Sequence, residues 1–153
     1  MITAVKLLSG ESIPVVALGV YRARPDETYA AVKSALSLGY RHIDTAQVYG
    51  NESEVGKAVK DSGIPRPDVF ITSKVWLDNW GYDSTLASLK ATLQRLQTPY
   101  VDLMLLHAPG EPASRADTWR ALEDAKSQVC GTGAERGTRQ GMERCMIDGP
   151  LSL

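Results

Sequence analysis

Strand-like and helix-like segments alternate along most of this chain, and this alternation limits the possible folds more than any other feature. Short apolar runs end at the polar residues Asp44, Lys74 and His107, at intervals of 30 and 33 residues. The segments between them carry apolar residues at helical spacing. Such alternation predicts a parallel sheet, as in a (β/α)8 barrel with about 31 residues per unit. A doubly wound sheet has units of similar length, so the spacing alone leaves both folds open.

The local patterns predict a hairpin followed by four strand–helix units. The hairpin would pair residues 4–8 with residues 13–16 around a turn-rich connector. The four strands are expected at residues 15–21, 41–44, 69–75 and 101–106. The four helices are expected to begin near Asp26, Asn51, Asp83 and Ser114, and the last would run to about residue 126.

Finer expectations concern helix caps and burial. Asp26 is expected to cap the first helix, and Asn51 begins a sequence that resembles a capping box. The nearly continuous apolar run 101–106 predicts a strand that is buried on both faces of the sheet. In the fourth helix, Trp119 and Leu122 are expected to face inward.

Composition narrows the class of protein. The 17 basic and 18 acidic residues give a net charge of −1, so no long-range field favours nucleic acid or an anionic membrane as a partner. No apolar run reaches the length of about 18 residues that a membrane-spanning helix needs. The two cysteines, Cys130 and Cys145, lie in the last quarter and make no disulfide framework. A cytoplasmic protein is therefore expected.

The composition and the periodicity of the sequence change at Val129. Residues 129–153 contain five glycines and show neither strand nor helix periodicity where a fifth strand would be due. We therefore predict a first part, residues 1–128, that carries the fold and a tail, residues 129–153, that is irregular or disordered and foreign to it.

The polar residues at the strand ends suggest proton chemistry when they are taken together. Alone, Asp44 could be a turn or helix cap, Tyr49 a partly buried aromatic and His107 a core histidine. Lys74 near the end of a buried strand needs a counter-charge, because an unpaired charge is costly to desolvate. A phenol is a poor proton donor at neutral pH unless nearby charge tunes it. A lysine and a carboxylate beside Tyr49 would provide that charge, and a carbonyl reduced at such a site needs a separate hydride source.

Five motifs carry a resemblance to a known family. Residues 39–56 contain Gly-Tyr-Arg-His-Ile-Asp-Thr-Ala-x-x-Tyr followed by Asn-Glu-x-x-Val-Gly. The others are Leu18-Gly19, Phe-Ile-Thr-Ser-Lys-Val-Trp at 70–76, Tyr-Val-Asp-Leu at 100–103 and Leu106-His107. Together they resemble the aldo-keto reductases over about residues 3–127. The resemblance implies an α/β fold, the N-terminal half of a (β/α)8 TIM barrel with a basal β-hairpin. It also implies reduction of aldehydes or ketones to alcohols with NADPH or, less often, NADH.

The resemblance also implies roles for individual residues. Tyr49 would be the general acid, Lys74 and Asp44 would increase its acidity, and His107 would orient the carbonyl. Asp44 would also contact the cofactor, together with Gly19 and Val20. The residues that would line the substrate pocket are Tyr21, Val48, Trp76, His107 and Ala108. No metal is implied. Tyr21 and Ala108 each stand where many members carry a tryptophan, which makes the pocket less aromatic, so substrate choice does not follow from the resemblance.

The second half of the family's barrel has no counterpart in residues 129–153. The residues that bind the phosphates and the adenine are expected there, so most of the cofactor site would be missing and the chain would be a C-terminally truncated member. Two functions remain open on this basis. One is a working reductase, and the other is a non-catalytic remnant that acts through binding. Self-association through open sheet edges is expected in either case.

Overall fold

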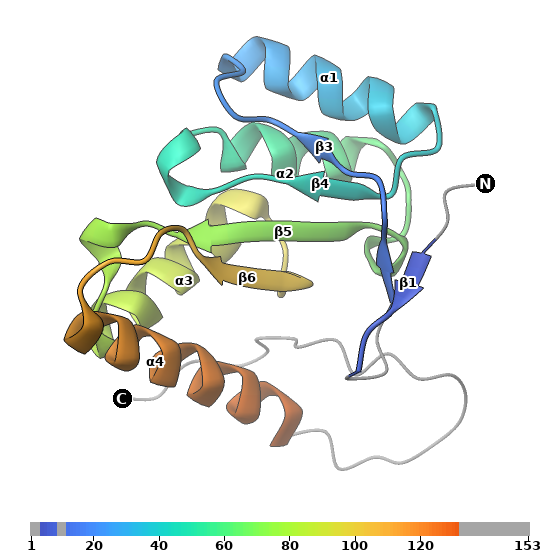
Figure 1. Cartoon of the computed structure of the whole chain (residues 1–153). Helices are drawn as coiled ribbons and strands as arrows, with labels where there is room; N and C mark the ends of the chain where they lie inside the picture. The colour runs from blue at the N-terminus through green and yellow to red at the C-terminus, as the bar shows by residue number, and fades with distance from the viewer. Residues whose placement is uncertain (1–3, 9–11, 132–153) are drawn as a thin grey trace.

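The computed structural model describes residues 4–8 and 12–131, and it contains a four-stranded parallel sheet. The strands are β3 (Leu18–Gly19), β4 (His42–Asp44), β5 (Phe70–Val75) and β6 (Leu103–Leu106), side by side in that order (Figure 1). Gly19 is paired with Asp44, and Val75 is paired with Leu106. The carboxyl ends of the strands therefore meet at one edge of the sheet.

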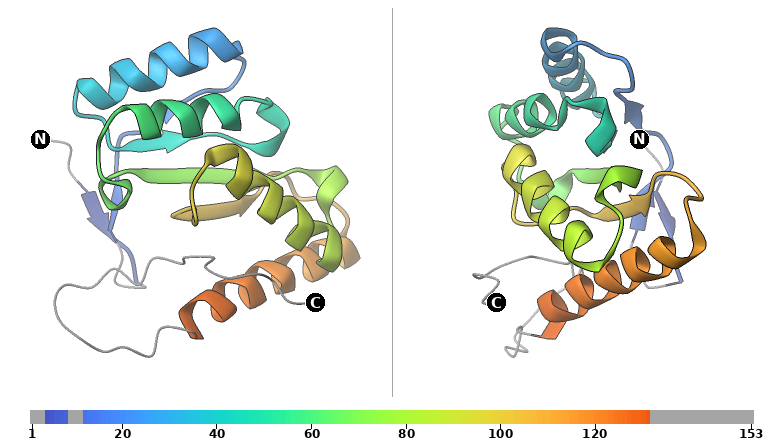
Figure 2. Two further views of the ribbon diagram at one scale, coloured as in Figure 1. Left: turned by 180° about the vertical axis from the view of Figure 1, so that it is seen from behind. Right: turned by 90° about the vertical axis from the view of Figure 1, so that its left-hand side faces the viewer.

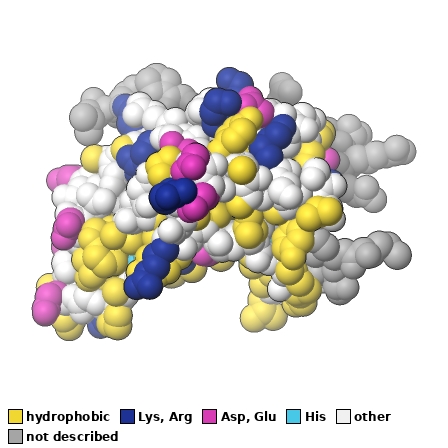
Figure 3. Space-filling model, turned by 90° about the horizontal axis from the view of Figure 1, so that it is seen from above, with side chains coloured by type: hydrophobic (Ala, Val, Ile, Leu, Met, Phe, Trp, Pro, Cys, Tyr) yellow, Lys and Arg dark blue, Asp and Glu magenta, His cyan; other side chains and the backbone are white. Residues whose placement is uncertain are grey.

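Four helices form an outer arc around one side of this sheet (Figure 2). They are α1 (Pro25–Ser37), α2 (Glu52–Asp61), α3 (Tyr82–Leu96) and α4 (Pro112–Gly131). Each helix packs against the next one along the chain. In the part of the chain that the structure describes, none of these helices is both long and apolar enough to cross a membrane. On the side seen from above α1, basic and acidic side chains lie next to one another (Figure 3).

A hairpin covers the end of the sheet opposite the carboxyl ends. It consists of β1 (Ala4–Lys6) and β2 (Ser12–Pro14), which run antiparallel. His42 joins the hairpin to the sheet, because its Nδ1 lies 3.1 Å from the Pro14 carbonyl oxygen, which can only accept a hydrogen bond. Its Nε2 therefore accepts from the Thr72 hydroxyl at 2.9 Å.

The hydrophobic core lies between the sheet and the helices. Ile43 and Ile71 are fully buried against side chains of α1 and α2 such as Val32 and Val55. Gly56 allows α2 to approach α3 closely, because a Cβ at this position would overlap the backbone carbonyl of Leu96. The expected hairpin, parallel strands and helices are therefore confirmed as half of a (β/α)8 barrel.

Two expected caps are wrong. The N-cap residue of α1 is Arg24, whose backbone N–H donates to the Glu27 carboxylate at 3.0 Å, and Asp26 lies within the first turn. Asn51 precedes α2 but makes no side-chain cap. Its amide instead donates to the Val20 carbonyl oxygen at 2.9 Å, which ties the start of α2 to the segment after β3.

The burial expected for the last strand and helix also needs correction. β6 is shorter than the apolar run 101–106 and is the last strand of the described sheet, so Leu105 is 37% exposed. On α4, Thr118 and Ala121 are buried against α3, whereas Trp119 is 53% exposed. Helix α4 continues to Gly131, so the irregular tail predicted from Val129 begins with helical residues. The rest of that prediction, residues 132–153, lies outside the described residues.

Candidate active site

A lysine–carboxylate pair stands at the carboxyl ends of the two central strands. Lys74 lies near the end of β5 and Asp44 at the end of β4. The Lys74 Nζ donates to both carboxylate oxygens of Asp44, at 2.7 and 2.8 Å, and to the Thr45 carbonyl oxygen at 2.9 Å. Only 15% of the Lys74 side chain is exposed, so these three acceptors offset the cost of desolvating its charge.

Tyr49 completes a triad with this pair. It ends the short 3-10 helix η1 (Gln47–Tyr49), which directly follows β4. Its hydroxyl oxygen lies 3.4 Å from the Lys74 Nζ. A cation at this position stabilises the negative charge that forms on the oxygen when the phenol gives up its proton. The arrangement suits a general acid.

His107 follows β6 and faces the same site. Its ring lies edge-on to Tyr49, with ring centroids 5.6 Å apart, and edge-on to Trp76 at 5.1 Å. Burial, and next the Lys74 charge, lower the pKa of His107, whereas Asp44 opposes this effect. The lowered pKa favours the neutral imidazole. Its buried Nδ1 has no hydrogen-bond partner among the described residues.

The structure brings most of the predicted pocket residues together. Tyr21, after β3, packs on Tyr49 with ring centroids 4.9 Å apart. The rings of Tyr21, Tyr49, His107 and Trp76 thus form a continuous wall. Val48 and Ala108 are each at least partly exposed. In the sequence, Val48 directly precedes Tyr49 and Ala108 directly follows His107.

The three residues predicted to contact the cofactor, Asp44, Gly19 and Val20, differ in how accessible they are to a ligand. The carboxylate of Asp44 is 31% exposed. No atom lies within 4 Å of the place where a Cβ on Gly19 would stand, so a flat ring could approach its backbone. The Val20 side chain is buried in the core and its N–H donates to the Asp44 carbonyl oxygen at 3.1 Å. The nicotinamide end of a dinucleotide therefore fits beside Asp44 and Gly19, but not against the Val20 side chain.

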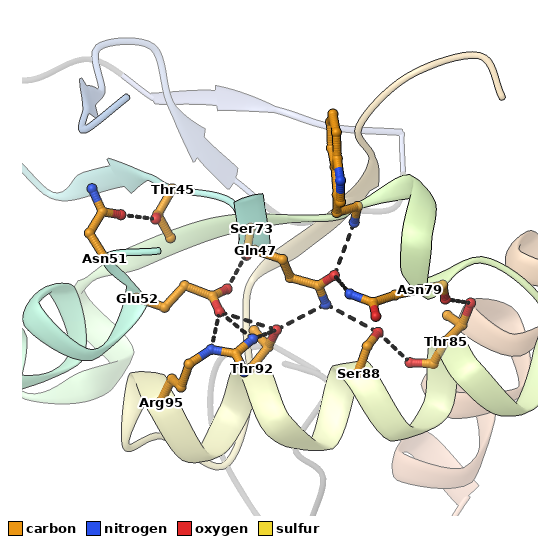
Figure 4. Close-up of polar contacts among 11 residues, drawn as sticks. Thr45, Gln47, Asn51, Glu52, Ser73, Asn79, Thr85, Ser88, Thr92 and Arg95 are labelled. Atoms are coloured by element: carbon orange, nitrogen blue, oxygen red, sulfur yellow. Dashed lines mark hydrogen bonds and ion pairs between the residues drawn. The ribbon is translucent and has the colours of Figure 1, made fainter. Parts of the chain in front are cut away.

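Sequence reasoning missed Gln47, whose amide makes four hydrogen bonds (Figure 4). Its Nε2 donates to the hydroxyls of Ser88 and Thr92, each at 3.1 Å. Its Oε1 accepts from the Trp76 backbone N–H at 2.9 Å and from the Asn79 amide at 2.8 Å. Gln47 occupies one of the two variable positions of the motif that ends at Tyr49, so the motif carried no signal for it.

Glu52 was also missed as a site residue. Its carboxylate is buried and accepts from the Ser73 hydroxyl at 2.6 Å and from the Arg95 side chain at 2.7 Å (Figure 4). Ser73 is the residue before Lys74 on β5. The Asn-Glu motif contains Glu52, but a glutamate at the start of a helix is also an ordinary surface residue.

The comparisons with known proteins agree with this geometry. Residues 16–132 match the model of the aldo/keto reductase family. The chain belongs to this family. It is similar to the methylglyoxal reductase DkgB of Salmonella typhi, with 46% identity over 119 residues that cover 76% of the chain and 45% of the relative.

Solved structures of the family show the same fold. The chain superposes on an aldo/keto reductase from Brucella melitensis with a TM-score of 0.81 and 46% identity, covering 84% of the chain and 50% of that structure. An aldo-keto reductase from Bombyx mori, solved in complex with NADP, gives a TM-score of 0.77 and 35% identity, with 82% and 47% covered. The chain therefore spans about half the length of these relatives.

Proposed function

We propose that this chain acts as an NADPH-dependent carbonyl reductase that converts small aldehydes or ketones to alcohols, with Tyr49 as the proton donor. The observation that carries the proposal is the position of Lys74, which contacts the Tyr49 hydroxyl while both oxygens of Asp44 hold its ammonium group. The bound NADP in the Bombyx mori structure supports the choice of cofactor. Carbonyl reduction by other family members supports the choice of reaction.

Each residue has a task in the proposed reaction. The neutral His107 donates a hydrogen bond to the carbonyl oxygen and orients the substrate. When bound, the reduced nicotinamide supplies the hydride that the carbonyl carbon receives. As negative charge develops on the carbonyl oxygen, Tyr49 transfers its hydroxyl proton to it, and Lys74 stabilises the phenolate that remains. A proton from solvent then restores the phenol, so the products are the alcohol and the oxidised cofactor.

The pocket walls favour a small substrate. The aromatic rings of Tyr21 and Trp76 flank Tyr49 and His107. Val48 directly precedes Tyr49 in the sequence. A relative that shares 46% identity is a methylglyoxal reductase. We therefore propose that short α-dicarbonyl compounds such as methylglyoxal are substrates.

Transfer of deuterium tests the proposed reaction. The purified chain would be incubated with methylglyoxal and NADPH that carries deuterium at both hydrogen positions of C4 of the nicotinamide. We expect the label on the carbinol carbon of the product, because hydride transfer moves that hydrogen directly. An alcohol without the label, or no alcohol from a folded sample, would contradict the proposal.

A binding role is the second candidate, and the sheet edges favour it. In the described sheet, β3 and β6 each pair with only one strand. Val16, before β3, and Leu105, in β6, expose 45% and 37% of their surface. Hydrophobic side chains also gather along one border of the space-filling view (Figure 3). Open apolar edges favour pairing with another chain.

Light scattering coupled to size-exclusion chromatography tests this second candidate. We expect a dimer or a larger assembly if the edges pair with those of another copy. A monomer that melts cooperatively would refute self-association. The affinity for NADPH then separates the two candidates, since a reductase must bind the cofactor and a binding protein need not do so.

A further inference from the structure

We propose that Gln47 is a positioning residue that holds Tyr49 and Trp76 at a set separation, on the two sides of His107, in the aromatic wall of the substrate site. This inference rests on the proposed reductase function, in which Tyr49 donates the proton and Trp76 lines the pocket. Gln47 has no contact with the triad through its side chain. Two of its four hydrogen bonds connect the segment that carries Tyr49 to the segment that carries Trp76. The other two connect it to α3.

The hydrogen-bond partners of the Gln47 amide determine which of its atoms is the oxygen and which is the nitrogen. The Trp76 backbone N–H can only donate, so the atom 2.9 Å from it must be the amide oxygen, Oε1. The Ser88 hydroxyl donates to the Thr85 carbonyl oxygen at 2.9 Å, so its oxygen accepts from Nε2 of Gln47. The amide thus uses both donors and both acceptor sites. A side chain that is fully bonded in one orientation can set the geometry of its neighbours.

The two segments that Gln47 joins carry the Tyr49 and Trp76 rings of the aromatic wall described above. Gln47 begins η1, so fixing its side chain also fixes the 3-10 turn that ends at Tyr49. Trp76 leaves the end of β5, and Asn79 ends the 3-10 helix η3 (Leu77–Asn79) that follows it. One amide oxygen accepts from both Trp76 and Asn79, and it therefore anchors the entry and the exit of that turn. His107 lies between the Tyr49 and Trp76 rings.

Helix α3 anchors the Gln47 side chain. Ser88 and Thr92, which accept from Gln47, are both buried. Thr92 also donates to the Glu52 carboxylate at 3.4 Å, and Glu52 accepts from Ser73 on β5 (Figure 4). The network therefore connects α3, α2, β5 and η1 through residues that are buried or partly buried. Gln47 is the member that lies in the turn of Tyr49 and is also bonded to Trp76.

Replacing Gln47 with methionine tests the inference, because methionine has a similar length and cannot form the four bonds. The Trp76 N–H and the hydroxyls of Ser88 and Thr92 would lose their partner. The segments that carry the Tyr49 and Trp76 rings would then be free to shift. We expect kcat for methylglyoxal reduction to fall by about 10- to 100-fold, as is typical when reacting groups are misplaced by about 1 Å. The Kd for NADPH should stay unchanged, because the four hydrogen bonds of the Gln47 side chain go to Ser88, Thr92, Trp76 and Asn79 and not to Gly19 or Asp44. A kcat equal to that of the wild type would overturn the inference.

A destabilised control separates positioning from general loss of stability. Asp102 accepts from the Arg66 side chain at 2.7 Å and from the Ile71 backbone N–H at 2.9 Å, toward the opposite end of the strands. Asp102→Asn should lower the melting temperature but leave kcat unchanged in the folded protein. If Asp102→Asn lowers kcat as much as Gln47→Met at the same loss of stability, Gln47 has only a structural role.

Amide hydrogen exchange measured by NMR gives a readout that needs neither cofactor nor substrate. In Gln47→Met, the Trp76 amide proton should exchange at least about tenfold faster, while the amide of Val75 in β5 keeps its protection. The cross-peaks between the Trp76 and His107 rings should weaken. Unchanged exchange at Trp76 would overturn the inference. If the wild type reduces no carbonyl compound, the reductase proposal fails, and this measurement still decides the role of Gln47.

Discussion

The ammonium nitrogen of Lys74 lies 2.7 and 2.8 Å from the two carboxylate oxygens of Asp44, on the neighbouring strand. Both side chains are largely withdrawn from water, so each charge depends on the other for compensation. The pair also places the Lys74 cation 3.4 Å from the Tyr49 hydroxyl. Stability and proposed chemistry thus depend on the same contact.

Lys74→Met should affect both properties at once. The variant leaves the Asp44 carboxylate without its cation, and we expect the free energy of unfolding to fall by about 1–3 kcal/mol. Carbonyl reduction should fall to background, because nothing then stabilises the Tyr49 phenolate. Urea unfolding and NADPH oxidation measure the two effects. The double variant Lys74→Met/Asp44→Asn should recover part of the stability and none of the activity. Equal stability of Lys74→Met and the wild type would contradict this reading of the pair.

The lowered pKa of His107 predicts a pH dependence of stability. Its pKa in the folded chain lies below the ordinary value of 6.5. As the pH falls through 6.5, the unfolded chain takes up the proton first, so stability that is present above this pH is progressively lost below it. In His107→Gln, unfolding measured between pH 5 and 6.5 should depend less on pH. A wild type and a variant with parallel pH profiles would show that His107 does not titrate in this way.

Two glycine substitutions should differ in their effect on stability. In Gly56→Ala, the added Cβ overlaps the Leu96 backbone, so α2 and α3 must separate, at a cost of about 1–3 kcal/mol. Gly19→Ala is the matched control, since its Cβ meets no atom within 4 Å. We expect Gly19→Ala to melt like the wild type and to bind NADPH more weakly, because the added methyl group occupies the space beside Asp44. Thermal melting and NADPH titration of both variants check these outcomes.

The convergence of Asp44, Lys74 and His107 was predictable from the sequence. Each residue stands at or near the end of an apolar run, and parallel strands bring their carboxyl ends to one edge of the sheet. Tyr49 lies in a 3-10 turn after β4. Its grouping with Lys74 and Asp44 indicated a proton donor, and the motif that it shares with a known family supported that choice. The catalytic roles of these four residues remain predictions.

Other features depend on neighbours that a local pattern does not specify. The apolar run that ends at Leu106 predicted a strand buried on both faces, but the exposure of Leu105 depends on which strand lies beside β6. Trp119 looked like an inward residue, whereas the contact with α3 selects the face of Thr118 and Ala121. The hydrogen-bond partners of Gln47 lie 29 to 45 residues away in the sequence, so no local pattern could have indicated them.

The central claim is that the chain reduces carbonyl compounds with a proton from Tyr49, and NADPH oxidation tests it most directly. The purified wild type and Tyr49→Phe would be compared with methylglyoxal as substrate, after circular dichroism has shown that both are folded. We predict a substrate-dependent rate for the wild type and a loss of at least about 100-fold in Tyr49→Phe, as expected when a general acid is removed. No rate from the folded wild type, or an equal rate from both proteins, would contradict the claim.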